Sequence, residues 1–217
     1  MKKCGSRMAA MAVVACMMSV MLTACGKESQ ETAVMPLKSL EKAEDALQDG
    51  EYAVEFTAED LQQTEDGYEL NVTVYDYDRY DVDTVNGLKV GGQIQFCKDM
   101  VTVDSLAKNE ETGYYTINGG VENGGLELKL EDNWYRTCTM DDYPCYYEVG
   151  TVNIPIAEEI VLEDHSDMDN EPDGVITANY DDFLETVQKN TIFFGCGNTT
   201  ITVKQGEIVK IIRRWVP

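Results

Sequence analysis

The chain is poor in the side chains from which most hydrolytic active sites are built. It has a single histidine, His165, and two tryptophans among 217 residues. A serine or cysteine nucleophile needs a base that takes its proton, and histidine fills that role most often. No Gly-x-Ser-x-Gly turn and no glycine-rich phosphate loop is present either. The sequence therefore argues against a triad hydrolase and against a nucleotide-dependent enzyme.

Positive charge is the second shortage. Lys and Arg number 17 against 40 Asp and Glu, which gives a formal net charge of −23. Because like charges repel, this surface disfavours nucleic acid and anionic lipid headgroups as partners. Cations, basic proteins and neutral ligands such as glycans remain compatible with it. A small secreted hydrolase that works with two carboxylates, such as a glycosidase, also stays open, because it needs no histidine.

The longest apolar run lies near the N-terminus. Residues 8–24 carry no charge and follow three basic residues, which is the order of a secretory signal peptide. The run ends at Leu22-Thr23-Ala24-Cys25, which resembles the lipobox of bacterial lipoproteins. The resemblance implies cleavage before Cys25 and attachment of diacylglycerol to its thiol, so that lipid holds the chain at the extracytoplasmic membrane surface. An uncleaved spanning helix and an ordinary signal peptide are the alternatives.

This resemblance divides the chain into three parts. Residues 1–24 are the predicted signal peptide, residues 25–49 a tether with a short helix, and residues 50–217 a mainly β domain. Cleavage removes three basic residues and no acidic ones, which leaves a net charge of −26. A charge of this size also keeps a domain soluble beside its membrane.

From residue 50 onward the apolar residues recur with a period of two, which is typical of half-buried strands. The clearest alternating segments are residues 52–56, 70–74, 94–96, 101–103, 126–130 and 201–203. Glycine-containing turns separate them, for example at Asn86-Gly87. The pattern predicts one mainly β domain, either a single antiparallel sandwich or a partly open barrel, with one short helix in its C-terminal half.

Helical spacing is confined to two segments. Leucines at positions 37, 40 and 47 predict the tether helix over residues 37–48. Residues 181–189 begin with two acids and place Phe183, Leu184 and Val187 on one face, which predicts the C-terminal-half helix.

The C-terminal segment combines a turn with the densest basic cluster. Residues 199–209 predict a hairpin that turns at Gln205-Gly206. Residues 210–214 contain three basic side chains. Next to so acidic a body, we expect them to form ion pairs rather than a binding site.

Four cysteines remain once the signal peptide is removed and Cys25 carries lipid. They are Cys97, Cys138, Cys145 and Cys196. An even number outside the cytoplasm permits two disulfides. Because Cys138 and Cys145 bracket a short turn-like insert, the preferred pairs are Cys138 with Cys145 and Cys97 with Cys196. Buried free thiols are the alternative, and the spacing does not fit a zinc site.

Residues 169–180 resemble an EF-hand or dockerin calcium loop, because carboxylates alternate before Gly174. The resemblance makes calcium the candidate cofactor. Its candidate ligands are Asp169, Glu171, Asp173, Thr177 and Asp181. The segment departs from the loop at Tyr180, which stands where the bidentate acid belongs. A solvated acidic loop is the alternative.

Residues 75–83 alternate tyrosines with acids, which suits a glycan platform. A sugar ring packs on a tyrosine face while carboxylates accept its hydroxyl protons. The candidates are Tyr75, Tyr77 and Tyr80. If Leu70 faces inward, Tyr75 and Tyr77 share the outward face, although β propensity alone also explains exposed tyrosines. A second aromatic group comprises Tyr143, Tyr146 and Tyr147.

The sequence thus predicts a lipid-anchored, extracytoplasmic lipoprotein whose β domain binds a glycan or protein partner and does not catalyse. Two other classes stay open. One is the carboxylate-dependent hydrolase, and the other is a structural lipoprotein that only contacts a partner.

Overall fold

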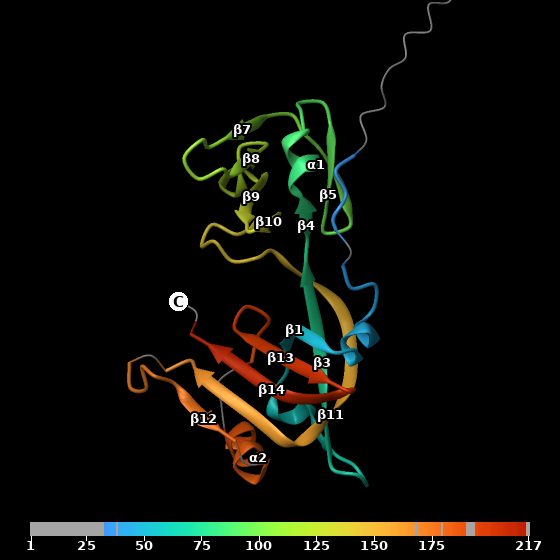
Figure 1. Cartoon of the computed structure of the whole chain (residues 1–217), viewed down its shortest axis with the longest axis vertical. Coiled ribbons are helices and arrows are strands. Elements are labelled where there is room, and N and C mark those ends of the chain that lie inside the picture. Colours follow the sequence, from blue (N-terminus) through green and yellow to red (C-terminus); the bar gives the residue numbers. More distant parts are fainter. Residues whose placement is uncertain (1–32, 38, 168, 179, 190–193, 216–217) are drawn as a thin grey trace, which may run out of the picture. The chain divides into compact units, whose positions relative to one another are not determined.

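A computed structural model describes residues 33–37, 39–167, 169–178, 180–189 and 194–215 (Figure 1). The predicted signal peptide and Cys25 lie outside these residues. The described chain is mainly β, which confirms the predicted fold class. Its strands are β1 (Gly50–Glu55), β2 (Leu61–Gln63), β3 (Tyr68–Tyr77), β4 (Arg79–Asp81), β5 (Gln93–Phe96), β6 (Asp99–Thr102), β7 (Leu106–Lys108), β8 (Tyr115–Ile117), β9 (Leu126–Glu131), β10 (Trp134–Cys138), β11 (Tyr146–His165), β12 (Val175–Thr177), β13 (Thr199–Lys204) and β14 (Glu207–Arg214).

Five strands of the seven-stranded sheet close on themselves into a small barrel (Figure 1). β1 pairs with β3 and with β13, and β13 pairs with β14. The 20-residue β11 completes the ring, because its first half pairs antiparallel with β3 and its second half pairs in parallel with β14. β2 and β12 extend the sheet beside β3 and β11.

The barrel interior is filled by the apolar residues that the period of two identified. On β3 these are Leu70, Val72 and Val74, all fully buried. Side chains that point inward on every strand form one continuous core, and that burial is the main term that favours folding. The helix α2 (Tyr180–Lys189) adds Phe183, Leu184 and Val187 to this core, which confirms the helix predicted over residues 181–189.

A second, smaller core forms within the segment that separates β3 from β11. Here β4, β10, β9, β8 and β7 pair in that order, and β5 pairs with β6 as a hairpin. The short helix α1 (Val82–Asn86) begins at Asp81, whose side chain accepts the Thr84 N–H. Tyr80, Ile94, Ile117, Leu128 and Tyr135 are among its buried residues.

The tether prediction was wrong in its extent. Among the described residues of 37–48, the helical ones are those of the 3-10 helix η1 (Ala43–Leu47). The Leu40 N–H instead donates to the Asp76 carboxylate at 2.8 Å. That hydrogen bond fixes Leu40 against the end of β3 instead of within a helix. Among the described residues, no helix is both long and apolar enough to cross a membrane.

The basic C-terminal cluster forms ion pairs, as expected. Arg213 on β14 lies opposite Asp164 on β11 in the parallel register. Its Nε donates to Asp164 Oδ1 at 2.9 Å and its Nη2 donates to Oδ2. Burial alone raises the pKa of Asp164, but hydrogen bonds from Arg213 and Ser166 outweigh burial and hold that pKa below its ordinary value. Arg213 is only 2% exposed, so this pair is internal to the fold.

Removal of this carboxylate leaves a buried guanidinium without its partner. We expect Asp164→Ala to lower the free energy of unfolding by about 3–5 kcal/mol, measured by urea denaturation at pH 7. The matched control is Glu163→Gln, because Glu163 pairs with Lys210 at 2.8 Å in a more exposed position. That change should cost no more than about 1 kcal/mol. Equal losses in the two variants would contradict the internal role of Asp164.

The same pair has a pH signature. The folded pKa of Asp164 is lowered from 3.8, so its stabilisation is complete above that value and is lost as the pH falls through the folded pKa. The stability difference between the wild type and Asp164→Ala should therefore shrink below about pH 4.

Candidate functional site

Tyr75 and Tyr77 lie on the outer face of β3, as the alternation predicts, because Val74 and Asp76, which alternate with them, point inward. Each is partly buried. In the antiparallel register Tyr77 is opposite Tyr146, the first residue of β11. The two rings are 5.6 Å apart with an interplanar angle of 87°, which is an edge-to-face pair. Strand pairing thus joins the two aromatic groups of the sequence.

Tyr80 does not belong to this surface, which corrects the predicted three-tyrosine platform. It is an even number of positions from Leu70, so it points to the same inward side, and it is fully buried. Its hydroxyl donates to the Gln95 carbonyl at 2.7 Å. Because this hydrogen bond is internal, Tyr80 stabilises the small core and cannot contact a ligand beside Tyr75.

A hollow of about 280 Å³ lies beside the two outer tyrosines of β3. We call it the tyrosine hollow. It is lined by Leu40, Glu51, Tyr52, Ala53, Tyr75, Asp76, Tyr77, Arg79 and Tyr146. Its residues come from β1, β3, β4, β11 and the segment before η1. Sequence reasoning missed Tyr52, which lines the hollow although its parity matches the buried Val54.

Asp76 fixes the wall of the tyrosine hollow. It is 5% exposed, and its Oδ2 accepts the Leu40 N–H at 2.8 Å. Its Oδ1 accepts hydrogen bonds from the Tyr77 N–H at 2.9 Å and from Arg79 Nη2 at 3.1 Å. Arg79 in turn lies 5.0 Å from the centre of the Tyr77 ring. One buried carboxylate therefore orients a cation over a tyrosine face, a contact that stabilises both.

The hydroxyls of Tyr75 and Tyr52 stay neutral at physiological pH. Burial and the adjacent Glu55 carboxylate raise the pKa of Tyr75 to about 12, and its hydroxyl donates to Glu55 Oε2 at 3.3 Å. Burial and the carboxylates of Asp45 and Asp49 also raise the pKa of Tyr52. A neutral phenol both donates and accepts a hydrogen bond, so the walls suit a ligand with many hydroxyl groups.

A second cavity of about 590 Å³ shares Tyr146 with the tyrosine hollow. Tyr143, Pro144, Cys145 and Cys196 also line it. Burial raises the pKa of Tyr146, and the neighbouring Tyr77 raises it further. Tyr146 therefore separates two openings in the surface, and both present aromatic walls.

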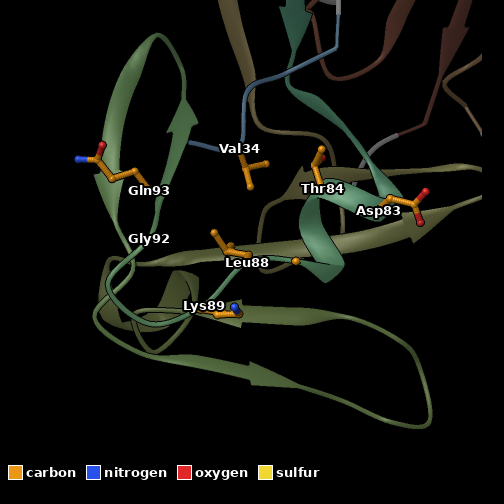
Figure 2. Close-up of a pocket in the computed structure, with 8 residues that line it drawn as sticks. Val34, Asp83, Thr84, Leu88, Lys89, Gly92 and Gln93 are labelled. Carbon is orange, nitrogen blue, oxygen red and sulfur yellow. The ribbon is translucent and has the colours of Figure 1, made fainter. Parts of the chain in front are cut away.

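A third cavity, of about 250 Å³, lies beside α1 (Figure 2). Figure 2 shows Val34 and Leu88 at its centre, while the polar ends of Asp83 and Gln93 point away on opposite sides. The Thr84 hydroxyl donates to the Asp81 carbonyl as part of the helix cap. Lys89 also lines this cavity. The described residues of its lining include no aromatic side chain, so this cavity fits a sugar ring less well than the tyrosine hollow does.

The predicted calcium ligands are not gathered around one point. Asp169, Glu171 and Asp173 lie in the exposed turn before β12, whereas Thr177 belongs to β12 and pairs with Leu162. Asp181 lies on α2 and lines a separate acidic cavity with Asp66, Glu158 and Glu159. Within the described ranges, no three His, Cys, Asp or Glu side chains form a group that could hold a metal ion. Calcium binding stays a prediction.

Gly174 has a structural reason to be glycine. Its φ is +74°, and a Cβ built there would lie 2.3 Å from His165 Nδ1. Close packing against His165 therefore accounts for the glycine that the calcium-loop resemblance interpreted as a turn residue.

Neither predicted disulfide is formed. Cys97, Cys138, Cys145 and Cys196 are free thiols. Cys138 forms a β-bridge with Pro144, so the next residue, Cys145, points to the opposite face. Burial raises the pKa of Cys196, and the nearby Glu55 carboxylate raises it further. Cys196 lies near Tyr146, on the outer face that carries Tyr75 and Tyr77.

Comparison of the chain with protein-family models, with curated proteins and with solved structures finds no match. The functional argument therefore depends on the geometry of this molecule.

The raised pKa of Tyr75 leads to a spectroscopic prediction. Burial raises the pKa of Tyr147 to about 12 as well, so we expect the absorbance titration of tyrosinate in the wild type to contain a step near pH 12 with the amplitude of two tyrosines. In Tyr75→Phe that step should be smaller by one tyrosine. Tyr114→Phe, which changes a partly exposed tyrosine outside the hollow, should retain the full step. Loss of a step near pH 10 in Tyr75→Phe would show that Tyr75 is not held in this environment.

Proposed function

We propose that this chain is a lipid-anchored lipoprotein at the extracytoplasmic membrane surface, and that its barrel binds a neutral glycan in the tyrosine hollow. The observation that carries the proposal is the Tyr77 and Tyr146 pair on the outer face of β3 and β11, beside a hollow of about 280 Å³. Aromatic faces pack against the apolar face of a sugar ring, and nearby polar groups then select its hydroxyl positions.

The barrel topology supports a binding role. In chain order the five barrel strands are β1, β3, β11, β13 and β14. The first pairs with the second and the fourth. The third pairs antiparallel with the second and in parallel with the fifth. The helix α2 lies between the third and fourth strands. This arrangement resembles the OB-fold, whose second and third strands carry the face that binds oligonucleotides or oligosaccharides. Those strands are β3 and β11 here, although fold alone does not assign a function.

Charge favours the oligosaccharide over the oligonucleotide. The mature chain has a net charge of −26, which repels a phosphate backbone. The basic group that lines the tyrosine hollow is Arg79, and it is already paired with Asp76. A neutral polyhydroxyl ligand pays no such electrostatic cost.

The anchor is tested through Cys25. We expect a bacterial host fed labelled palmitate to label the wild type and to leave Cys25→Ser unlabelled, because the thiol that accepts the lipid is gone. Cys16→Ser, which changes a cysteine within the predicted signal peptide, should keep the label. Label retained in Cys25→Ser would contradict the lipobox assignment.

The binding site is tested by native affinity electrophoresis in gels that contain soluble starch, xylan, mannan or mixed-linkage β-glucan. We expect at least one of them to retard the wild type. Tyr77→Ala and Tyr146→Ala should each weaken that binding about tenfold, or about 1.4 kcal/mol, because each loses an aromatic face. Tyr114→Ala is the matched control, because it removes a tyrosine outside the hollow.

Each alternative result has a meaning. No retardation in any gel, or equal losses in the hollow variants and in Tyr114→Ala, would overturn the glycan proposal. Binding of a single-stranded DNA probe that Tyr77→Ala abolishes would assign the same face to nucleic acid instead.

A further inference from the structure

The described chain begins beside the β5–β6 hairpin of the small core (Figure 1). Val34 forms a parallel β-bridge with Ile94, and its backbone N–H donates to the Gln93 carbonyl at 2.8 Å. The Gln95 N–H donates to the Val34 carbonyl at 2.9 Å. Residues 33–35 therefore lie alongside β5 and widen the hairpin into a ribbon.

One side of this ribbon packs on the small core. Ile94 is fully buried, Val34 is 4% exposed, and Val101 packs against the same core. Figure 2 shows Val34 pointing to Leu88 and the polar end of Gln93 pointing away. Side chains alternate along an extended chain, so the opposite side, which we call the ribbon face, is formed by the residues that alternate with the buried ones. The ribbon face comprises Met35, Gln93, Gln95, Met100 and Thr102.

The ribbon face combines two exposed methionines with uncharged polar residues. Met100 is directly opposite Gln95 in the antiparallel register, and Met35 lies next to Gln95 on its other side. Met35 is 51% exposed and Met100 is 47% exposed, and Leu37, two positions after Met35, is 42% exposed. An uncharged surface thus occurs in a chain with 40 acidic residues. Apolar side chains that gather on one exposed face mark a contact surface.

The covalent chain keeps the ribbon close to the proposed anchor. Ala33 is eight positions after Cys25, and an extended chain spans at most about 3.6 Å per residue, which gives a limit of about 29 Å. With lipid on Cys25, the start of the ribbon cannot lie farther than this from the membrane surface. The bilayer is therefore within reach of the ribbon face.

We propose that the ribbon face rests on the membrane bilayer, with the Met35 and Met100 side chains among the lipid headgroups. The inference rests on the lipid anchor proposed above. Contact with the bilayer removes the two thioether side chains from water, which favours the contact in proportion to the apolar area that is covered.

The anchor and the charge both favour the bilayer over a second copy of the chain. A tethered face meets the membrane at a high effective concentration, so a contact too weak to hold a free chain is enough to orient an anchored one. A second copy would carry the same net charge of −26, and the two bodies would repel each other. An uncharged face can also approach headgroups without the repulsion that an acidic face meets.

The experiment measures the oxidation of methionine in the lipidated chain after its insertion into phosphatidylcholine vesicles. Chloramine-T, an anionic oxidant that remains in the water, converts exposed methionine to its sulfoxide, and tandem mass spectrometry follows each position. The reference is the chain from residue 26 onward, which lacks Cys25 and keeps every described residue. We expect Met35 and Met100 to be oxidised severalfold more slowly on vesicles than in the reference. Met140, which is 66% exposed and lies between β10 and β11, should be oxidised at the same rate in both.

A pair of matched variants tests the ribbon face itself. Gln93→Glu combined with Gln95→Glu places two negative charges on this face, so the protection of the two methionines should be lost while both reporters remain. Gln62→Glu combined with Gln63→Glu is the control, because it adds the same charge to exposed positions of β2. This control should leave the protection unchanged.

The contrary results are distinct from one another. Equal oxidation of Met35 and Met100 on vesicles and in the reference, or equal protection of Met140, would show that the ribbon face does not rest on the bilayer. Protection that grows with protein density on the vesicle would assign this face to a second copy of the chain. Failure of the wild type to float with the vesicles would overturn the anchor and the inference together, whereas flotation with unprotected methionines would overturn the inference alone.

Discussion

The structure depends on one long strand that pairs on two sides. β11 hydrogen-bonds β3 through its first half and β14 through its second, and this double pairing closes the barrel. Two irregularities allow it: a register shift at Gly150, where φ is +149°, and another between Ile156 and Val161. Bulges bend a strand and increase its twist, which closure of so small a barrel requires. The inner core, the outer tyrosine face and the parallel register of Asp164 with Arg213 all follow from this closure.

A change of chemistry along β3 then sets the position of the tyrosine hollow. The inward positions are apolar up to Val74, but the next two inward positions are Asp76 and Asp78. Their carboxylates accept the backbone N–H groups of Leu40 and Cys97 respectively. Burial raises the pKa of Asp78, and the Cys97 N–H opposes that shift. Each carboxylate therefore holds a loop against the end of β3.

The period of two was sufficient to find the strands, because burial on one face acts on each strand locally. It could not reveal that β11 meets both β3 and β14, because register between distant strands leaves no local pattern. The same limit explains why the predicted pairing of Cys138 with Cys145 failed. Only the β-bridge between Cys138 and Pro144 shows that the side chain of Cys145 points away from that of Cys138. Tyr80 was assigned to the wrong face, although its parity with Leu70 was visible in the sequence. Tyr77 was predicted as a candidate, whereas its contact with Tyr146 required the strand pairing.

The tyrosine hollow is organised before any ligand arrives. Tyr77 is fixed between Tyr146 and Arg79, and Tyr75 is hydrogen-bonded to Glu55. Side chains already held in one arrangement lose little entropy on binding, so more of the contact energy appears as affinity. The charges of Arg79 and Asp76 compensate each other, and Glu51 adds a carboxylate to the lining, so the walls carry no net positive charge. Such a surface fits the neutral glycan that we propose as its ligand, because binding would then depend on shape and hydroxyl geometry rather than on charge.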